Sequence, residues 1–136
     1  MTSPRDIETR VEVIRRRDAY DTAPDAFLAD WQPEDAALRD TILAARAALP
    51  AVTTPGTALH DCAALCLALG SDGVRGELTL LRAARALAAT EGATTLGRAH
   101  LRRVAGMALG HRLRRDPLDE AGSAARVART VTEILP

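Results

Sequence analysis

Lysine is absent from this sequence. All 18 basic residues among its 136 are arginines, and they balance 18 acidic residues. A P-loop needs a lysine that reaches the β- and γ-phosphates of a nucleotide, so the chain carries no working P-loop of its own. Schiff-base chemistry on a lysine is excluded for the same reason. The sequence therefore predicts a domain that is not catalytic by itself in either of these ways.

Aromatic residues and cysteines are also scarce, with one Trp, one Tyr, one Phe and two Cys. The hydrophobic 47% is dominated by alanine and leucine, the strongest helix formers, which predicts an all-α domain. No apolar run is long enough to span a membrane. Residues 1–6 lack the apolar stretch of a secretory signal, and two cysteines without an export signal favour a reducing compartment. We expect a cytoplasmic protein.

Prolines and glycines divide the chain into pieces of helical length, and no alternating strand pattern is convincing. Pro33 suits a first helical turn, Thr95 and Ser123 suit helix caps, and Gly70 and Gly92 suit helix ends. The result is a bundle of five or six helices. The predicted segments are 6–20, a short piece at 26–31, then 33–49, 55–69, 76–90, 95–114 and 123–134.

Two groups could suggest a metal. Cys62 and Cys66 share a helix face at i and i+4, but no further Cys or suitably spaced His completes a zinc site. Buried structural cysteines are the favoured interpretation. Asp116, Asp119 and Glu120 could offer oxygens to Mg²⁺, but carboxylates are favoured at a loop and helix start in any case. No metal site is predicted.

Arginine is the informative residue. The eighteen residues from 98 to 115 include six arginines and no acidic residue, and the next acidic residue is Asp116. A nucleic-acid stripe is one interpretation. The neutral charge and the lack of interleaved aromatics favour a solvated face or an anionic protein partner instead. The six are Arg98, Arg102, Arg103, Arg112, Arg114 and Arg115.

A second group lies around Arg75, which has glycines at positions 73 and 76. These predict a tight turn that opens directly into a helix. A guanidinium held beside a helix N-terminus is attractive to phosphate. Arg82 and Arg85 follow on the same helix. The alternative is that Arg75 forms an ordinary surface ion pair.

At this stretch a family resemblance becomes specific. Residues 73–89 resemble the sensor 2 helix of magnesium chelatase ATPase subunits, a family of AAA+ proteins, and MoxR-type ATPases share the first part of the pattern. Residues 107–131 are similar to the C-terminus of that family, and residues 4–21 to the region upstream of its lid. The resemblance covers nearly the whole chain.

The resemblance implies an AAA+ lid, with a helical insertion and connecting helices over about 1–50 and the lid bundle with sensor 2 over about 51–136. Arg75 matches the sensor 2 arginine, which contacts the γ-phosphate of ATP. The preceding insertion favours action on a neighbouring subunit's ATP. The remaining candidates for a supporting or interface role are Arg82, Arg85, Arg112, Arg114 and Arg115.

In the family this region follows an ATPase core that carries the P-loop, so the resemblance implies ATP with Mg²⁺ in the full-length subunit only. The implied activity is Mg²⁺ insertion into protoporphyrin IX in (bacterio)chlorophyll synthesis. The implied partners are the core of the same subunit, a ring of like subunits, a second AAA+ subunit and a large porphyrin-binding subunit. The alternatives are a free-standing helical interaction module of a MoxR-like ATPase and a nucleic-acid binder.

Overall fold

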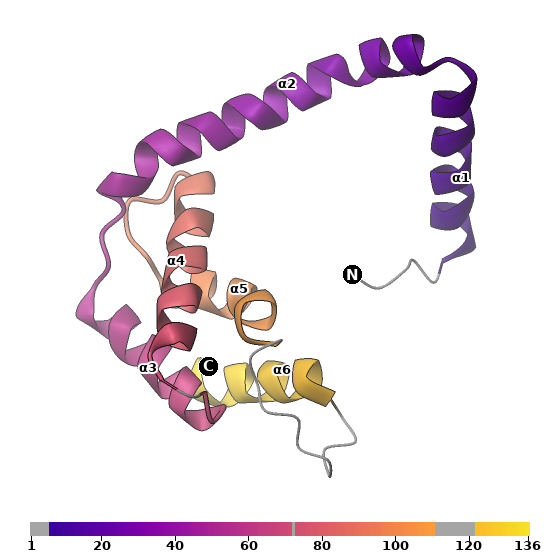
Figure 1. The fold of residues 1–136 in the computed structure, drawn as a ribbon. Coiled ribbons are helices and arrows are strands. Elements are labelled where there is room, and N and C mark those ends of the chain that lie inside the picture. The colour runs from indigo at the N-terminus through magenta and orange to yellow at the C-terminus, as the bar shows by residue number, and fades with distance from the viewer. Residues whose placement is uncertain (1–5, 72, 111–121) are drawn as a thin grey trace. The chain divides into compact units, whose positions relative to one another are not determined.

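The described part of the protein is helical, as predicted. The structure is a computed structural model, and it describes residues 6–71, 73–110 and 122–136. Within these residues the β pairing is limited to one isolated bridge between Thr53 and Thr95. None of the described helices is both long and apolar enough to cross a membrane. The helices are α1 (Ile7–Thr22), α2 (Pro24–Ala48), the 3-10 turn η1 (Leu49–Ala51), α3 (Gly56–Ala68), α4 (Arg75–Thr90), α5 (Arg98–Leu109) and α6 (Gly122–Ile134) (Figure 1).

The chain forms two compact units, residues 1–41 and residues 42–136, and the boundary falls inside α2. We call them the N-terminal unit and the C-terminal unit. In the C-terminal unit, α4 packs against α3 and α5, and α6 packs against the same two helices. This arrangement gives α4 a fixed position between its neighbours.

The core of the C-terminal unit is built from one face of each of its four helices. On α4 the buried positions Leu80, Ala84 and Ala88 recur every four residues and are wholly inaccessible to solvent. The alanines let the neighbouring helices approach closely. The large side chains that are fully buried here are Leu65, Leu80, Leu96, Leu101, Leu109, Val127 and Leu135.

A smaller cluster joins the end of α2 to α4. Val52 is buried together with Ala88 and Ala89, and Ala45 and Leu49 pack against them. The Thr53 N–H donates to the Thr94 carbonyl at 2.9 Å, and the Leu96 N–H donates to the Thr53 carbonyl at 2.9 Å. These bonds tie the segment before α3 to the segment before α5.

The N-terminal unit has no buried residue on α1 or on α2. Aromatic rings make contacts within it: the ring centroids of Tyr20 and Phe27 lie 5.8 Å apart in an edge-on arrangement, and those of Phe27 and Trp31 lie 6.0 Å apart. The Arg16 guanidinium lies over the Trp31 ring at 4.5 Å, which is a cation–π distance. The three aromatic residues of the chain are therefore all used in one place.

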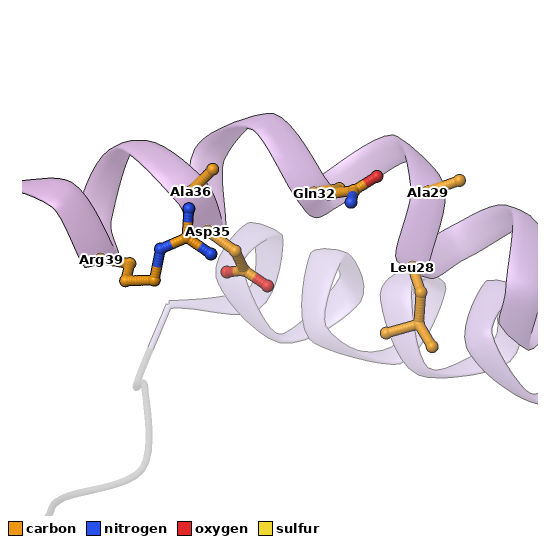
Figure 2. Close-up of a pocket in the computed structure, with 6 residues that line it drawn as sticks. All are labelled: Leu28, Ala29, Gln32, Asp35, Ala36 and Arg39. Atoms are coloured by element: carbon orange, nitrogen blue, oxygen red, sulfur yellow. The ribbon is translucent and has the colours of Figure 1, made fainter.

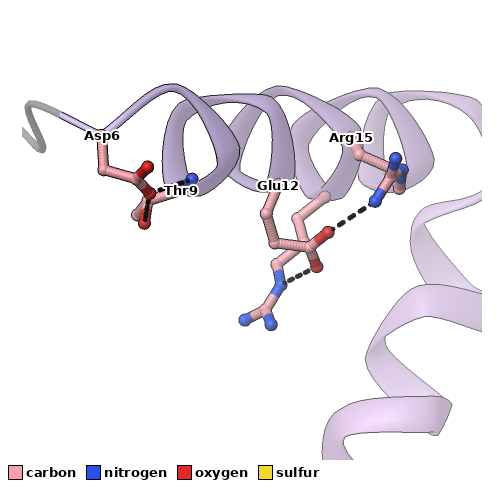
Figure 3. Close-up of polar contacts among 5 residues, drawn as sticks. Asp6, Thr9, Glu12 and Arg15 are labelled. Atoms are coloured by element: carbon pink, nitrogen blue, oxygen red, sulfur yellow. Dashed lines mark hydrogen bonds and ion pairs between the residues drawn. The ribbon is translucent and has the colours of Figure 1, made fainter.

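The start of α1 is held by side chains close in sequence. The Thr9 N–H donates to the Asp6 carboxylate at 2.7 Å, so Asp6 is the N-cap. One turn later the Glu12 carboxylate pairs with Arg15 at 2.9 Å and with Arg16 at 2.8 Å (Figure 3). These contacts are local and exposed.

The prediction of two helical segments between residues 26 and 49 was wrong, because α2 is continuous and contains Pro33. A proline inside a helix removes the hydrogen bond to the carbonyl four residues earlier, here that of Ala29. Ala29 and Pro33 are both exposed. Water can therefore satisfy the carbonyl, and Pro24 rather than Pro33 occupies the first helical position.

Both predicted caps were also wrong. The N-cap of α5 is Gly97 rather than Thr95, whose hydroxyl lies 2.9 Å from that of Thr53. Ser123 lies inside the first turn of α6, which begins at Gly122. The predicted ends at Gly70 and Gly92 agree with their φ angles of 67° and 71°. Helix α5 ends at Leu109, and the predicted extension to 114 falls outside the described residues.

Candidate functional site

Arg75 is the first residue of α4, where the turn after α3 ends. Gly70 and Gly73 within that turn have φ angles of 67° and 68°, a conformation that favours glycine. The predicted turn that opens directly into a helix is therefore present. Gly76 does not contribute to it as a turn residue, because it is already inside the helix.

The Arg75 side chain is exposed, and no ion pair within the described residues includes it. Among the described residues, no side-chain hydrogen bond caps the start of α4 at its N-cap residue Val74. Gly76 in the first turn is buried, so the exposed part of this helix start is at Arg75 itself. An anion is stabilised at such a helix end by the N–H groups and the helix dipole together.

Contacts with α3 fix the position of this helix start. The Cys62 thiol donates to the Glu77 carbonyl at 3.4 Å, which joins the middle of α3 to the first turn of α4. A Cβ on Gly76 would collide with the Ser71 hydroxyl and would lie 3.6 Å from the Cys66 sulfur. Gly76 is thus required for a close approach of α4 to the preceding turn.

The two cysteines are buried free thiols, as the sequence predicted. The hydrogen bond with Cys62, burial and the nearby Glu77 carboxylate all raise the pKa of the Cys66 thiol. The Glu77 Oε2 atom is buried with no hydrogen-bond partner in the described part of the chain. No cluster of three or more possible metal ligands occurs among the described residues. The contact of Cys62 and Cys66 with the first turn of α4 is therefore a packing contact.

Arg82 and Arg85 on the same helix have different environments. Arg82 is exposed. It lies seven residues beyond Arg75, which places it about two turns further along the same face. Arg85 is partly buried, and its Nη2 donates to the Leu49 carbonyl at 3.2 Å, while its buried Nε has no hydrogen-bond partner among the described residues. Arg85 therefore ties α4 to η1.

Arg98, the first arginine of the predicted stripe, is used inside the fold. Its Nε and Nη2 donate to the two oxygens of Asp61 at 2.9 Å and 3.0 Å, a bidentate pair between α5 and α3. The hydrogen bonds from Arg98 hold the pKa of the Asp61 carboxyl below its usual range. Sequence reasoning missed this pair, because its members lie 37 residues apart.

The other arginines of the predicted stripe differ from one another in their contacts. Arg103 pairs with Glu91, while Arg102 is exposed. His100, also missed, accepts a hydrogen bond at Nδ1 from the Gly97 N–H at 2.9 Å and places Nε2 3.3 Å from Glu91. A histidine three residues after a helix-opening glycine is the one local signal that could have indicated this cap. Arg112, Arg114 and Arg115 lie outside the described residues.

The chain is similar to a known protein family and to known proteins. The model of the AAA lid domain family matches residues 59–133. The chain is 74% identical over 134 residues to the magnesium-chelatase 38 kDa subunit of Rhodobacter capsulatus, covering 98% of this chain and 38% of that protein. It is 72% identical to the subunit of the same name from Cereibacter sphaeroides, covering 98% and 40%.

Among solved structures, the chain is similar to one in a cryo-EM-based model of the complex between subunits BchI and BchD of magnesium chelatase. The sequence identity is 63%, the match covers 100% of this chain and 39% of the other, and the TM-score is 0.47. The chain thus spans about two fifths of the length of the curated relatives just described.

Proposed function

The chain belongs to the AAA lid domain family, and from that premise we propose that it is the lid of a magnesium-chelatase ATPase subunit. The identities of 74% and 72% to subunits with that name support the assignment to this branch. The identity extends over 98% of the chain, so it includes α1 and α2 as well as the bundle.

In this proposal Arg75 is the sensor 2 residue and contacts the γ-phosphate of ATP. The observation that carries it is the position of Arg75: an exposed guanidinium beside an uncapped helix start, on a helix packed between α3 and α5. Phosphoryl transfer is accelerated mainly by positioning and by charge stabilisation. A fixed guanidinium supplies both, and its contact differs between ATP and ADP, which couples hydrolysis to movement of the lid.

The activity of the whole subunit follows as part of the same proposal. ATP with Mg²⁺ binds to an ATPase core beyond this chain, and hydrolysis drives Mg²⁺ insertion into protoporphyrin IX in (bacterio)chlorophyll synthesis. Like subunits form a ring that works with a second AAA+ subunit and a large porphyrin-binding subunit. This chain supplies the lid and Arg75, and by itself we expect negligible ATP turnover and weak nucleotide binding.

The test is Arg75→Ala in the complete ATPase subunit. Loss of a charged contact of about 1.5–3 kcal/mol should slow ATP hydrolysis roughly ten- to hundredfold. Arg75→Lys keeps the charge but loses the planar fork, and it should recover only part of the rate. Steady-state ATPase kinetics on the assembled subunit measure both effects.

The matched control is Arg82→Ala, which removes an exposed arginine from the same face of α4 about two turns away. It should slow ATP hydrolysis much less than Arg75→Ala does, because Arg82 lies further from the helix start. Equal rates for Arg75→Ala and the unaltered subunit would overturn the role of Arg75. An equal loss in both variants would show that general positive charge on α4 is sufficient, and it would favour an interaction module over a phosphate sensor.

A further inference from the structure

Gly76 directly follows Arg75 and is an unusual residue for its place in the fold. It lies inside α4 and is buried, although glycine weakens a helix relative to alanine. The backbone conformation does not require a glycine there, because the described glycines with positive φ angles are Gly70, Gly73 and Gly92. The reason for a glycine at position 76 is therefore the space that a side chain would occupy.

That space is taken by the turn between α3 and α4. A Cβ on Gly76 would collide with the Ser71 hydroxyl, and it would lie 3.4 Å from the Ser71 Cβ and 3.6 Å from the Cys66 sulfur. The Ser71 N–H donates to the Cys66 carbonyl at 3.0 Å, so the end of α3 holds the Ser71 backbone in place. Gly56, in contrast, is exposed at the first position of α3, with no atom within 4 Å of where its Cβ would be. Two glycines near helix starts thus differ, and packing requires only the one at position 76.

Helix α3 also contacts the next residue of α4. The Cys62 thiol lies one helical turn before Cys66 and donates to the Glu77 carbonyl at 3.4 Å. Gly76 and Glu77 are the two residues that follow Arg75. The backbone on the C-terminal side of Arg75 is therefore in contact with α3 or with the turn after it at two successive residues.

These contacts matter for Arg75 because its own side chain is exposed. Successive residues of a helix project about 100° apart, so Arg75 can lie at the surface while Gly76 packs inward. The reach of the guanidinium then depends on where the backbone of the first turn is held. At a reacting centre, a misplacement on the order of 1 Å can cost about a hundredfold in rate.

We propose that Gly76 is the positioning residue for Arg75. Its missing side chain lets the first turn of α4 pack against Ser71 and Cys66, and this contact sets the place from which the guanidinium meets the γ-phosphate of ATP. The proposal rests on the proposed function, in which Arg75 contacts ATP. Gly76 and Ser71 themselves make no contact with the nucleotide in this arrangement.

The direct test is Gly76→Ala in the complete ATPase subunit. ATP hydrolysis should slow by about three- to tenfold, less than in Arg75→Ala, because the Ser71 side chain can give way in part. Affinity for a non-hydrolysable ATP analogue should fall by a similar factor, whereas ADP lacks the γ-phosphate and should bind as before. Steady-state kinetics and calorimetric titration measure these effects. A simple loss of folded protein would lower the amount of active subunit without changing the ratio of the two affinities.

Combined variants test whether Gly76 acts through Arg75. Adding Gly76→Ala to Arg75→Ala should slow hydrolysis no further, because the group that Gly76 positions is already absent. Ser71→Ala removes the hydroxyl that collides and leaves a Cβ at 3.4 Å, which is an ordinary contact. Together with Gly76→Ala it should return the rate to within about twofold of the unaltered subunit. Gly56→Ala is the matched control at an open helix start, and it should leave both the rate and the affinities unchanged.

Four outcomes would overturn the positioning role while leaving the role of Arg75 intact. Gly76→Ala could hydrolyse ATP at the unaltered rate, it could lose affinity for ADP and the ATP analogue equally, it could slow the Arg75→Ala variant further, or Ser71→Ala could fail to restore its rate. Unaltered hydrolysis by Arg75→Ala alone is a different result. It would overturn the proposed function, and the positioning role with it.

Discussion

The two units of this chain are both helical but are stabilised in different ways. The C-terminal unit buries leucines of α3, α4 and α5 and valines of α6 in one core, whereas α1 and α2 bury none of their residues. Isolated helices are marginal in water, and in proteins most of their stability comes from packing of an apolar face. Helix-forming sequence and stable tertiary structure are therefore separate properties in this chain.

The same difference bears on function. Arg75 belongs to the unit with the core, where neighbouring helices hold the start of α4 in place. A residue that must be positioned within a fraction of an ångström benefits from such support. The exposed aliphatic residues of α2, among them Leu28 (Figure 2), lie in contrast outside that core.

The largest effect should come from Leu80→Ala. Leu80 is wholly buried in the core, and truncation of such a leucine costs about 2–5 kcal/mol through lost burial and the remaining cavity. The matched change Leu38→Ala, at a residue that is 60% exposed, should alter the free energy of unfolding by less than about 0.5 kcal/mol. Chemical denaturation of the chain measures both. Similar losses for the two variants would mean that α2 contributes to the same cooperative core.

The sequence was sufficient for the helices that carry the core. The apolar residues of α4 recur at helical spacing, and Gly70 and Gly92 mark helix ends, so these elements were predicted within a few residues. It was insufficient at Pro33. Whether a proline starts or interrupts a helix depends on access of water to one carbonyl, and local sequence does not encode that access.

The site shows the same limit. Arg75 could be singled out because the turn and the helix start are local features. The pairing of Arg98 with Asp61 could not, since it depends on α5 packing beside α3. Counting charges along the sequence places Arg98 in an open basic stripe. In the fold its guanidinium pairs with Asp61 instead. The role of Arg85 was hidden for the same reason, because its partner is a backbone carbonyl at η1.

A smaller effect, again confined to the C-terminal unit, should come from Asp61→Asn. Arg98 holds the pKa of Asp61 below its usual range. The unfolded chain therefore binds this proton at a higher pH than the folded chain does, and the stabilisation is complete above the unfolded pKa. It is lost as pH falls through the folded pKa. The variant should lose about 1 kcal/mol at neutral pH, since Arg98 is partly in solvent, and less under acid conditions.

Thermal unfolding between neutral pH and pH values below the ordinary Asp range measures this dependence. The control is Asp25→Asn in the first turn of α2, an exposed carboxylate of the N-terminal unit. It should leave unchanged the loss of stability that the C-terminal unit shows as pH falls. If the Asp61→Asn variant loses as much stability at acid pH as the unaltered chain does, the bidentate pair contributes no net stabilisation.

The smallest effect should follow Asp6→Ala, which removes the N-cap of α1. Hydrogen bonds from the Thr9 hydroxyl and N–H lower the pKa of Asp6, so the cap should also weaken as pH falls and the carboxylate takes up a proton. Because α1 has no buried residue, its first turn should fray without affecting the core of the C-terminal unit. Amide hydrogen exchange should accelerate near the start of α1 only, and Asp18→Ala in the same helix should not reproduce the change. Faster exchange in α4 as well would show that the two units unfold together, and the contrast between them would fail.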